Sequence, residues 1–193
     1  MLAWARGGGS LSLPPEAGFP VSTAPGDASH ILVQVHFDNP SQVARQSEQA
    51  GIRAYYTDTL RPHDAGLLLL GDPLLQFGTI SPGTLDHREG TCPSACTQDF
   101  VEPIHVIASL PHMHASGRTM VSTVNTASGD LRGVISRVDF WDFGFQGSIE
   151  SDLTIFPGDT IHTHCYFDAR YRTQALDFGY NSYDEMCSDF MLY

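Results

Sequence analysis

Two pairs of histidines are the sharpest chemical features of this sequence. His112-Met113-His114 and His162-Thr163-His164 share one spacing. Side chains two positions apart in a β-strand lie on the same face, so two such imidazoles can converge on one metal ion. A metal site also needs ligands from elsewhere in the fold, and either pair can equally be two solvated or hydrogen-bonded histidines. Spacing alone therefore does not choose between the two pairs.

A strand-borne His-X-His pair would suit a cupin, whose pattern needs a glutamate a few residues after the second histidine. The residues that follow His114 are Ala-Ser-Gly-Arg instead. The acidic ligand is missing, and the sequence argues against a cupin.

Met186, in the run Asp184-Glu185-Met186-Cys187, becomes a candidate ligand only in combination. Methionine usually fills a hydrophobic core. Its thioether is also the soft ligand that, together with two imidazoles, favours Cu(I) over zinc or iron. Cys187 and Cys165 can either form a disulfide, which would fix the segment carrying Met186, or remain buried thiols.

Short β-type segments between Pro-Gly-Asp and Ser-Pro-Gly turns must position these residues. The expected strands, rich in β-branched or apolar residues, are Ile31–Phe37, Ile52–Thr57, Leu67–Leu70, Ile104–Leu110, Thr119–Asn125, Leu131–Val138, Leu153–Phe156, Thr160–Phe167 and Cys187–Tyr193. One helix is expected over Ser41–Ala50, capped by Asn39, with Pro40 at its first position and Gly51 at its end. This pattern predicts an all-β fold, a sandwich or a barrel.

Composition excludes several classes of function. The chain has 193 residues and a formal net charge of −12, which argues against nucleic acid or an anionic membrane surface as the main partner. No apolar run approaches the roughly 20 residues of a membrane span, so we expect a soluble globular protein. The first residues, Met-Leu-Ala-Trp-Ala-Arg, do not have the pattern of a signal peptide.

From about residue 2 to its end, the chain resembles the second part of a copper type II, ascorbate-dependent monooxygenase. The stretches that carry the resemblance are Ala3–Ala5, Leu32–Pro40, Gly51–Thr57, Leu60-Arg61, Asp64–Gly66, His105–His114, Gly117-Arg118 and Asp184–Cys187. The resemblance implies an antiparallel, jelly-roll-like β-sandwich with the end of a preceding β-domain at its N-terminus. It further implies that residues 1–40 are the remnant of the N-terminal copper domain and 41–193 the C-terminal one.

The resemblance also implies roles for individual residues. His112, His114 and Met186 match the copper site at which oxygen binds and the substrate C–H bond is broken. His36 matches one histidine of a second copper site, which relays electrons from ascorbate. Cys165 and Cys187 match a disulfide pair next to the methionine. The remaining histidines match no copper ligand. We expect His162 and His164 to be strand residues with adventitious metal binding at most. His105 matches a histidine that is common in the family but binds no copper, and His30, His63 and His87 are expected to be surface or turn residues.

Three departures from the family pattern bear on function. The paired histidines that would complete the His36 site are absent from the sequence, so we expect an incomplete enzyme, from a fragment or an incomplete gene model. Leu110 stands where peptide-amidating members carry an arginine, and Phe190 where a tyrosine is usual, which argues against peptide amidation. Cys92 and Cys96 match cysteines whose partners lie outside this sequence, so they pair together, stay reduced or mark a truncated chain.

The leading hypothesis is therefore a copper-dependent monooxygenase region that hydroxylates a small-molecule substrate with O₂ and electrons from ascorbate, in the secretory pathway or outside the cell. The missing N-terminal domain would be a partner in a longer chain. One alternative is a non-catalytic copper-binding or recognition β-sandwich that has lost the electron-transfer half. Another is a purely structural domain without copper.

Overall fold

The computed structural model describes residues 4–5, 7–23, 28–35, 37, 39 and 41–193. The chain divides into two compact units, one formed by the residues up to Ser12 with Gly66–Tyr193, the other by Leu13–Ala65. Within the described residues, the second unit contains only two short strands, β1 (Ala17–Gly18) and β2 (His63–Asp64), which pair in parallel. The regular structure that positions the candidate site lies in the first unit.

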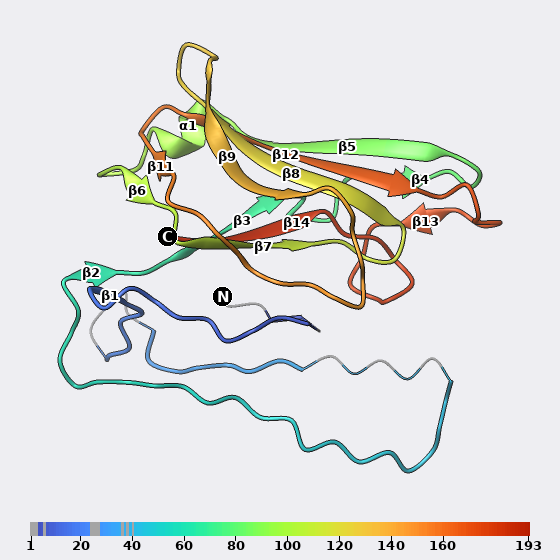
Figure 1. Ribbon diagram of the computed structural model, residues 1–193, viewed down its shortest axis with the longest axis horizontal. Coiled ribbons are helices and arrows are strands. Elements are labelled where there is room, and N and C mark those ends of the chain that lie inside the picture. The colour runs from blue at the N-terminus through green and yellow to red at the C-terminus, as the bar shows by residue number, and fades with distance from the viewer. Residues whose placement is uncertain (1–3, 6, 24–27, 36, 38, 40) are drawn as a thin grey trace. The chain divides into compact units, whose positions relative to one another are not determined.

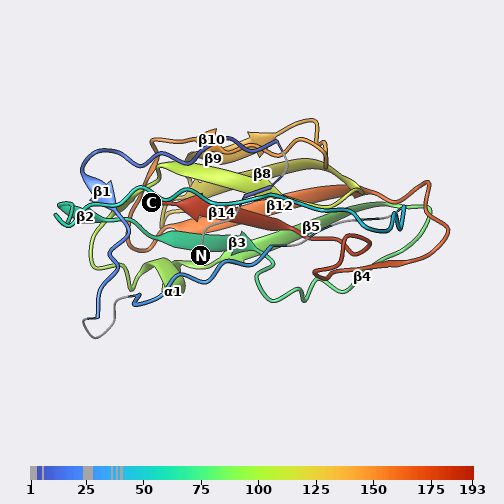
Figure 2. The same ribbon diagram turned by 90° about the horizontal axis from the view of Figure 1, so that it is seen from below.

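Two four-stranded antiparallel sheets form the body of the first unit and lie one over the other (Figures 1 and 2). The first has the order β10-β7-β14-β3, that is Ile149–Glu150, Ala108–His112, Ser188–Leu192 and Leu67–Gly71. The second has the order β5-β12-β8-β9, that is Leu85–Cys92, Thr160–Asp168, Gly117–Asn125 and Leu131–Val138. The prediction of an all-β sandwich is confirmed.

Short elements lie around the two sheets. β6 (Ile104–His105) pairs with β11 (Thr154–Ile155), and β4 (Thr79–Ile80) pairs with β13 (Leu176–Asp177). The α-helix α1 is a single turn, Ser94–Thr97. Within the described part of the chain, no helix has the length and apolar character needed to cross a membrane.

The core between the sheets is formed by every second side chain along the strands, because successive side chains point to opposite faces. On β12, Ile161, Thr163 and Cys165 are buried, whereas His162 and His164 are partly exposed. The inward-facing side chains of both sheets pack into two apolar clusters, one of which includes Met113 and Met120 and the other Val124 and Met191. Burial of this apolar surface is the main source of stability of such a sandwich.

A buried carboxyl group connects the two sheets through the core. Asp189 on β14 accepts hydrogen bonds from the hydroxyls of Ser109 on β7, Ser122 on β8 and Ser136 on β9, the last two at 2.6 Å. Burial raises the pKa of Asp189, and the three hydroxyl donors oppose that shift. A buried carboxyl group needs such partners, and these join the two sheets directly behind the end of β7.

The prediction of two strands in the second unit is wrong. Residues 31–35 and 37 form no strand, and neither do residues 52–57; Leu32 is 92% exposed and Tyr56 95%. A strand needs a neighbour to satisfy its backbone groups. The described pairings of this unit, β1 with β2 and one bridge between Val21 and Ala28, do not involve these segments.

The expected helix over residues 41–50 is also wrong. These residues are exposed and irregular, and Gln42 and Arg45 have positive φ angles of 51° and 60°. A helix of this length is marginal without an apolar face to bury, and no residue from 41 to 50 is buried.

One long strand was missed by the sequence interpretation. β5 has the sequence Leu-Asp-His-Arg-Glu-Gly-Thr-Cys and lies at the edge of its sheet. Polar side chains occupy both of its faces, so the apolar alternation that predicts a half-buried strand is lacking. The strands expected around β3, β7, β8, β9, β12 and β14 are confirmed.

Candidate metal centre

His112 and His114 lie at the end of β7, a strand with neighbours on both sides. Met113 between them is fully buried, so the alternation of the strand turns both imidazoles away from the core. Their ring centroids are 5.2 Å apart, with an angle of 85° between the planes. His114 is 5% exposed and His112 is half-buried. The two imidazoles are therefore neighbours in a sheltered position.

The register of β14 directs the segment that contains Met186 toward the same place. Ser188 pairs with His112 in the antiparallel ladder, and continuing this register past the end of the ladder places Met186 opposite His114. The contacts agree, because Asp184 and Glu185 both bond to His114. Segments about 70 residues apart in the sequence thus meet here.

A side-chain amide fixes the proton of His112. Gln146 donates from Nε2 to the carbonyl oxygen of Phe143 at 2.9 Å, which turns its Oε1 toward His112. The His112 Nδ1–H then donates to this Oε1 at 2.7 Å. An imidazole that carries its proton on Nδ1 has a lone pair free on Nε2.

A backbone carbonyl does the same for His114. Its Nδ1 lies 2.9 Å from the carbonyl oxygen of Asp184. Because a carbonyl only accepts, Nδ1 must carry the proton, and Nε2 keeps its lone pair. A hydrogen bond from the second ring nitrogen to a carbonyl or amide oxygen is the usual support of a metal-binding histidine.

Burial lowers the pKa of His112 to about 4, with the neighbouring His114 contributing in the same direction and the Gln146 bond opposing it. His112 is therefore neutral at neutral pH. A neutral imidazole is the form that binds metal ions.

A buried carboxylate holds the turn that carries His114. Glu185 is fully buried, and its two oxygens accept the backbone N–H groups of His114 at 3.0 Å and Ser116 at 2.6 Å. Burial raises the pKa of Glu185, whereas these N–H donors act in the opposite direction. The segment that contains Met186 is thus tied directly to the segment that contains His114.

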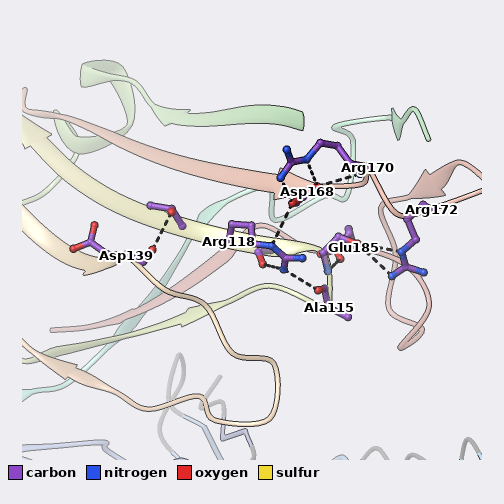
Figure 3. Close-up of polar contacts among 10 residues, drawn as sticks. Ala115, Arg118, Asp139, Asp168, Arg170, Arg172 and Glu185 are labelled. Carbon is purple, nitrogen blue, oxygen red and sulfur yellow. Dashed lines mark hydrogen bonds and ion pairs between the residues drawn. The ribbon is translucent and has the colours of Figure 1, made fainter. Parts of the chain in front are cut away.

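Further side chains contact the turn that carries His114, and Figure 3 shows the arginines among them. The Arg172 guanidinium donates to Ser116 Oγ at 3.2 Å, and the Trp141 indole N–H donates to the carbonyl oxygen of His114 at 2.9 Å. Next to them, Asp168 lies between Arg170, at 2.9 Å, and Arg118, at 3.8 Å. The turn is therefore held in one arrangement by several separate segments.

The disulfide between Cys165 and Cys187, which the family resemblance implied, is present. It links β12 to the residue immediately after Met186, and so joins the two sheets next to the site. Cys92 and Cys96 are free thiols, and burial, with Cys96 nearby, raises the pKa of Cys92 to about 11.

The other candidate ligands lie elsewhere. His36 lies outside the described residues. His162 and His164 are on β12, in the other sheet, and face away from the core. Within the described residues, no three His, Cys, Asp or Glu side chains come together as a metal-binding group. The set of His112, His114 and Met186 differs from such groups because its third donor is a thioether.

Sequence reasoning missed the residues that support the histidines. Glu185 belongs to the same run as Met186, but nothing in the run indicated that its carboxylate caps the turn at His114. Gln146 and Trp141 come from the connection between β9 and β10, whose sequence gives no sign of where it folds. Only long-range contacts identify these residues.

The family described as "Copper type II ascorbate-dependent monooxygenase, C-terminal domain" matches residues 63–193, and the corresponding N-terminal domain matches residues 1–44. Human DBH-like monooxygenase protein 1 is 33% identical over 201 residues, which cover 100% of this chain and 32% of the human protein.

Two further relatives are similar over the same extent. Dopamine beta-hydroxylase of Equus caballus is 34% identical over 198 residues, covering 100% of this chain and 32% of the horse protein. Tyramine beta-hydroxylase of Caenorhabditis briggsae is 32% identical over 195 residues, covering 99% of this chain and 33% of that enzyme. The chain thus spans about a third of the length of these relatives.

Proposed function

This chain belongs to the copper type II ascorbate-dependent monooxygenase family. We propose that it forms the oxygen-binding copper site of a hydroxylase, with His112, His114 and Met186 as ligands. In the overall reaction, a substrate C–H bond becomes C–OH and the second oxygen atom of O₂ becomes water. Two electrons from ascorbate and two protons complete the balance.

One observation carries the proposal. Both imidazoles of the His112/His114 pair hold their proton on Nδ1, through Gln146 Oε1 and the Asp184 carbonyl oxygen. Both therefore present a free Nε2, next to a segment that contains Met186.

The donor set suits the proposed chemistry. Two neutral imidazoles and a thioether bring no negative charge, and the soft sulfur favours the reduced ion, Cu(I). Copper, when bound, supplies the activation of O₂. The protein orients the two imidazoles through Gln146 and Asp184, keeps their protons away from the metal side, and holds the methionine segment through Glu185 and the disulfide at Cys187.

The electron-transfer half is proposed from the family match alone. We propose that residues 1–40 are the end of the N-terminal copper domain and that residues 41–193 are the C-terminal domain. His36 would be one ligand of the second copper ion, with the other ligands and further chain provided by a longer protein. The N-terminal family match over residues 1–44 supports this division.

The substrate is proposed to be a small molecule, not a peptide. Leu110 and Phe190, which face each other in the β7–β14 ladder, offer no charge for a peptide carboxylate. The Phe190 ring lies 6.3 Å from that of His112, so this apolar pair adjoins the candidate site. The Cys165–Cys187 disulfide supports an oxidising compartment, in the secretory pathway or outside the cell.

X-ray absorption at the copper edge tests the ligand set directly. The disulfide-bonded chain loaded with one equivalent of Cu(I) should show one thioether sulfur and about two imidazole nitrogens. Met186→Ala should remove the sulfur, and Met120→Leu, a change in the core, should keep it. Copper bound only by nitrogen and oxygen in the unmodified chain would overturn the ligand set.

A second measurement separates catalysis from copper binding alone. With ascorbate and a phenolic amine present, a protein that combines this chain with a complete N-terminal copper domain should consume O₂ and form a hydroxylated product. A correct ligand set without any ascorbate-driven turnover in that protein would instead support a copper-binding module that has no oxygenase activity.

A further inference from the structure

A second cluster of histidines lies on the outer face of the other sheet. His87 and Glu89 on β5 and His162, His164 and Tyr166 on β12 all point away from the core, as the alternation of their strands requires. In the antiparallel register, His87 faces Tyr166, Glu89 faces His164 and Thr91 faces His162. Residues directly opposite each other are the ones whose side chains meet on one face.

The rings of this cluster form a column along the sheet. Tyr166 stacks on His87 with centroids 4.4 Å apart, His87 on His164 at 5.3 Å and His164 on His162 at 6.3 Å. The angles between neighbouring planes are 18°, 18° and 11°. The three imidazoles are thus neighbours on one face of the sheet before any ligand arrives.

Donor atoms of the cluster already lie close together. His87 Nε2 is 3.1 Å from His164 Nδ1, and one oxygen of Glu89 is 3.8 Å from the same His164 nitrogen. Two nitrogens that each lie about 2.0–2.1 Å from a shared metal ion are themselves about 3 Å apart. The His87–His164 pair therefore has the separation of two neighbouring ligands.

We propose that His87, His164 and Glu89 form an exterior site for a divalent transition-metal ion such as Zn²⁺. Two imidazoles and one carboxylate favour such an ion over Mg²⁺ or Ca²⁺, which prefer sets of oxygen ligands. The site lies on the opposite sheet from His112 and His114, and it does not depend on the function proposed for that pair.

Formation of the site needs two small adjustments. As the described residues stand, no group of three His, Cys, Asp or Glu side chains could hold a metal ion. Glu89 must therefore turn from its 2.8 Å contact with His162 toward the two imidazoles. This turn also breaks the 3.2 Å hydrogen bond from Thr91 Oγ1 to Glu89, whose side chain is 40% exposed. The imidazole that donates in the His87–His164 bond must also move its proton to its other nitrogen, so no proton is lost overall.

Zn²⁺ titration of the full, disulfide-bonded chain tests the proposal, with calorimetry for affinity and assigned NMR signals for the histidine rings. The ring signals of His87 and His164 should shift together. His87→Ala and His164→Gln should each weaken Zn²⁺ binding at this site at least tenfold. These side chains lie at the surface, so the variants should keep the β-fold, which circular dichroism checks.

The matched control is His105→Ala, which removes another exposed strand histidine, one bonded to Thr154. Its Zn²⁺ affinity should stay within twofold of that of the unmodified chain. The proposal is overturned if the His87 and His164 signals move no more than that of His105. It is equally overturned if His162→Ala weakens binding more than His87→Ala does.

Discussion

The carboxylate of Glu185 accepts the backbone N–H of His114 at 3.0 Å from a fully buried position. Through this bond, the segment that carries the candidate thioether ligand is fixed to the turn that carries one of the candidate imidazoles. A metal site formed by two distant segments needs such a link, because each segment alone would leave its ligand free to move.

Replacement of Glu185 by Leu should destabilise the fold. The buried N–H groups of His114 and Ser116 would lose their acceptor, at about 1–3 kcal/mol for each. Urea unfolding followed by circular dichroism measures the loss in the free energy of unfolding. Glu102→Leu, at an exposed position, is the control and should change it by about 0.5 kcal/mol at most. Equal stability of both variants would contradict the role of Glu185.

Met186→Ala should weaken Cu(I) binding far more than His162→Ala, because the thioether is the soft donor of the proposed set and His162 faces outward on another sheet. A competition titration with a Cu(I) chelator measures both affinities. If the two variants lose affinity equally, Met186 is not a ligand of the site.

Gln146→Leu should reduce Cu(I) affinity by about 10–100-fold, the usual effect of removing the group that orients a ligating histidine. The change takes away the acceptor that holds the His112 proton on Nδ1. The same chelator competition measures the effect. Gln174→Leu, at an exposed position, is the matched control, and similar affinities for the two variants would exclude an orienting role for Gln146.

Loss of the disulfide should lower stability without abolishing the strand pattern. Cys165→Ser combined with Cys187→Ser should reduce the free energy of unfolding by about 2–5 kcal/mol, because the bond joins the two sheets. Thermal unfolding monitors the change. Cys96→Ser, at an exposed free thiol, should have little effect. Mass spectrometry of protein from an oxidising compartment should find Cys165 and Cys187 bonded.

Acid should lower the stability of the fold near the His114 turn, because Asp168 becomes protonated. Arg170 holds the pKa of Asp168 at about 2, below its usual 3.8. Between these pH values the unfolded chain binds more protons than the folded one, so the stabilisation is present above about pH 4 and is lost as the pH falls toward 2. The stability difference between the unmodified chain and Arg170→Gln, measured by urea unfolding, should shrink over this range. A difference that does not depend on pH would contradict the assignment.

Local sequence determined a large part of the fold. The strands β8, β9 and β12 were predictable because alternation and turn residues act over a few neighbouring positions. The same local signals failed for residues 31–35, 37 and 41–50, where a strand without a partner and a helix without a buried face did not form. These signals also missed β5, because a strand with polar residues on both faces has a sequence like that of a loop.

The surroundings of the two His-X-His pairs depend on the tertiary structure. Both pairs have the same spacing, and sequence by itself determined only that each could present two imidazoles on one face. Long-range contacts set what surrounds each pair: Asp184 and Glu185 bond to His114, whereas β5 brings Glu89 and His87 to His164. A site is made by the residues that long-range pairing places beside a motif, and no local pattern contains that information.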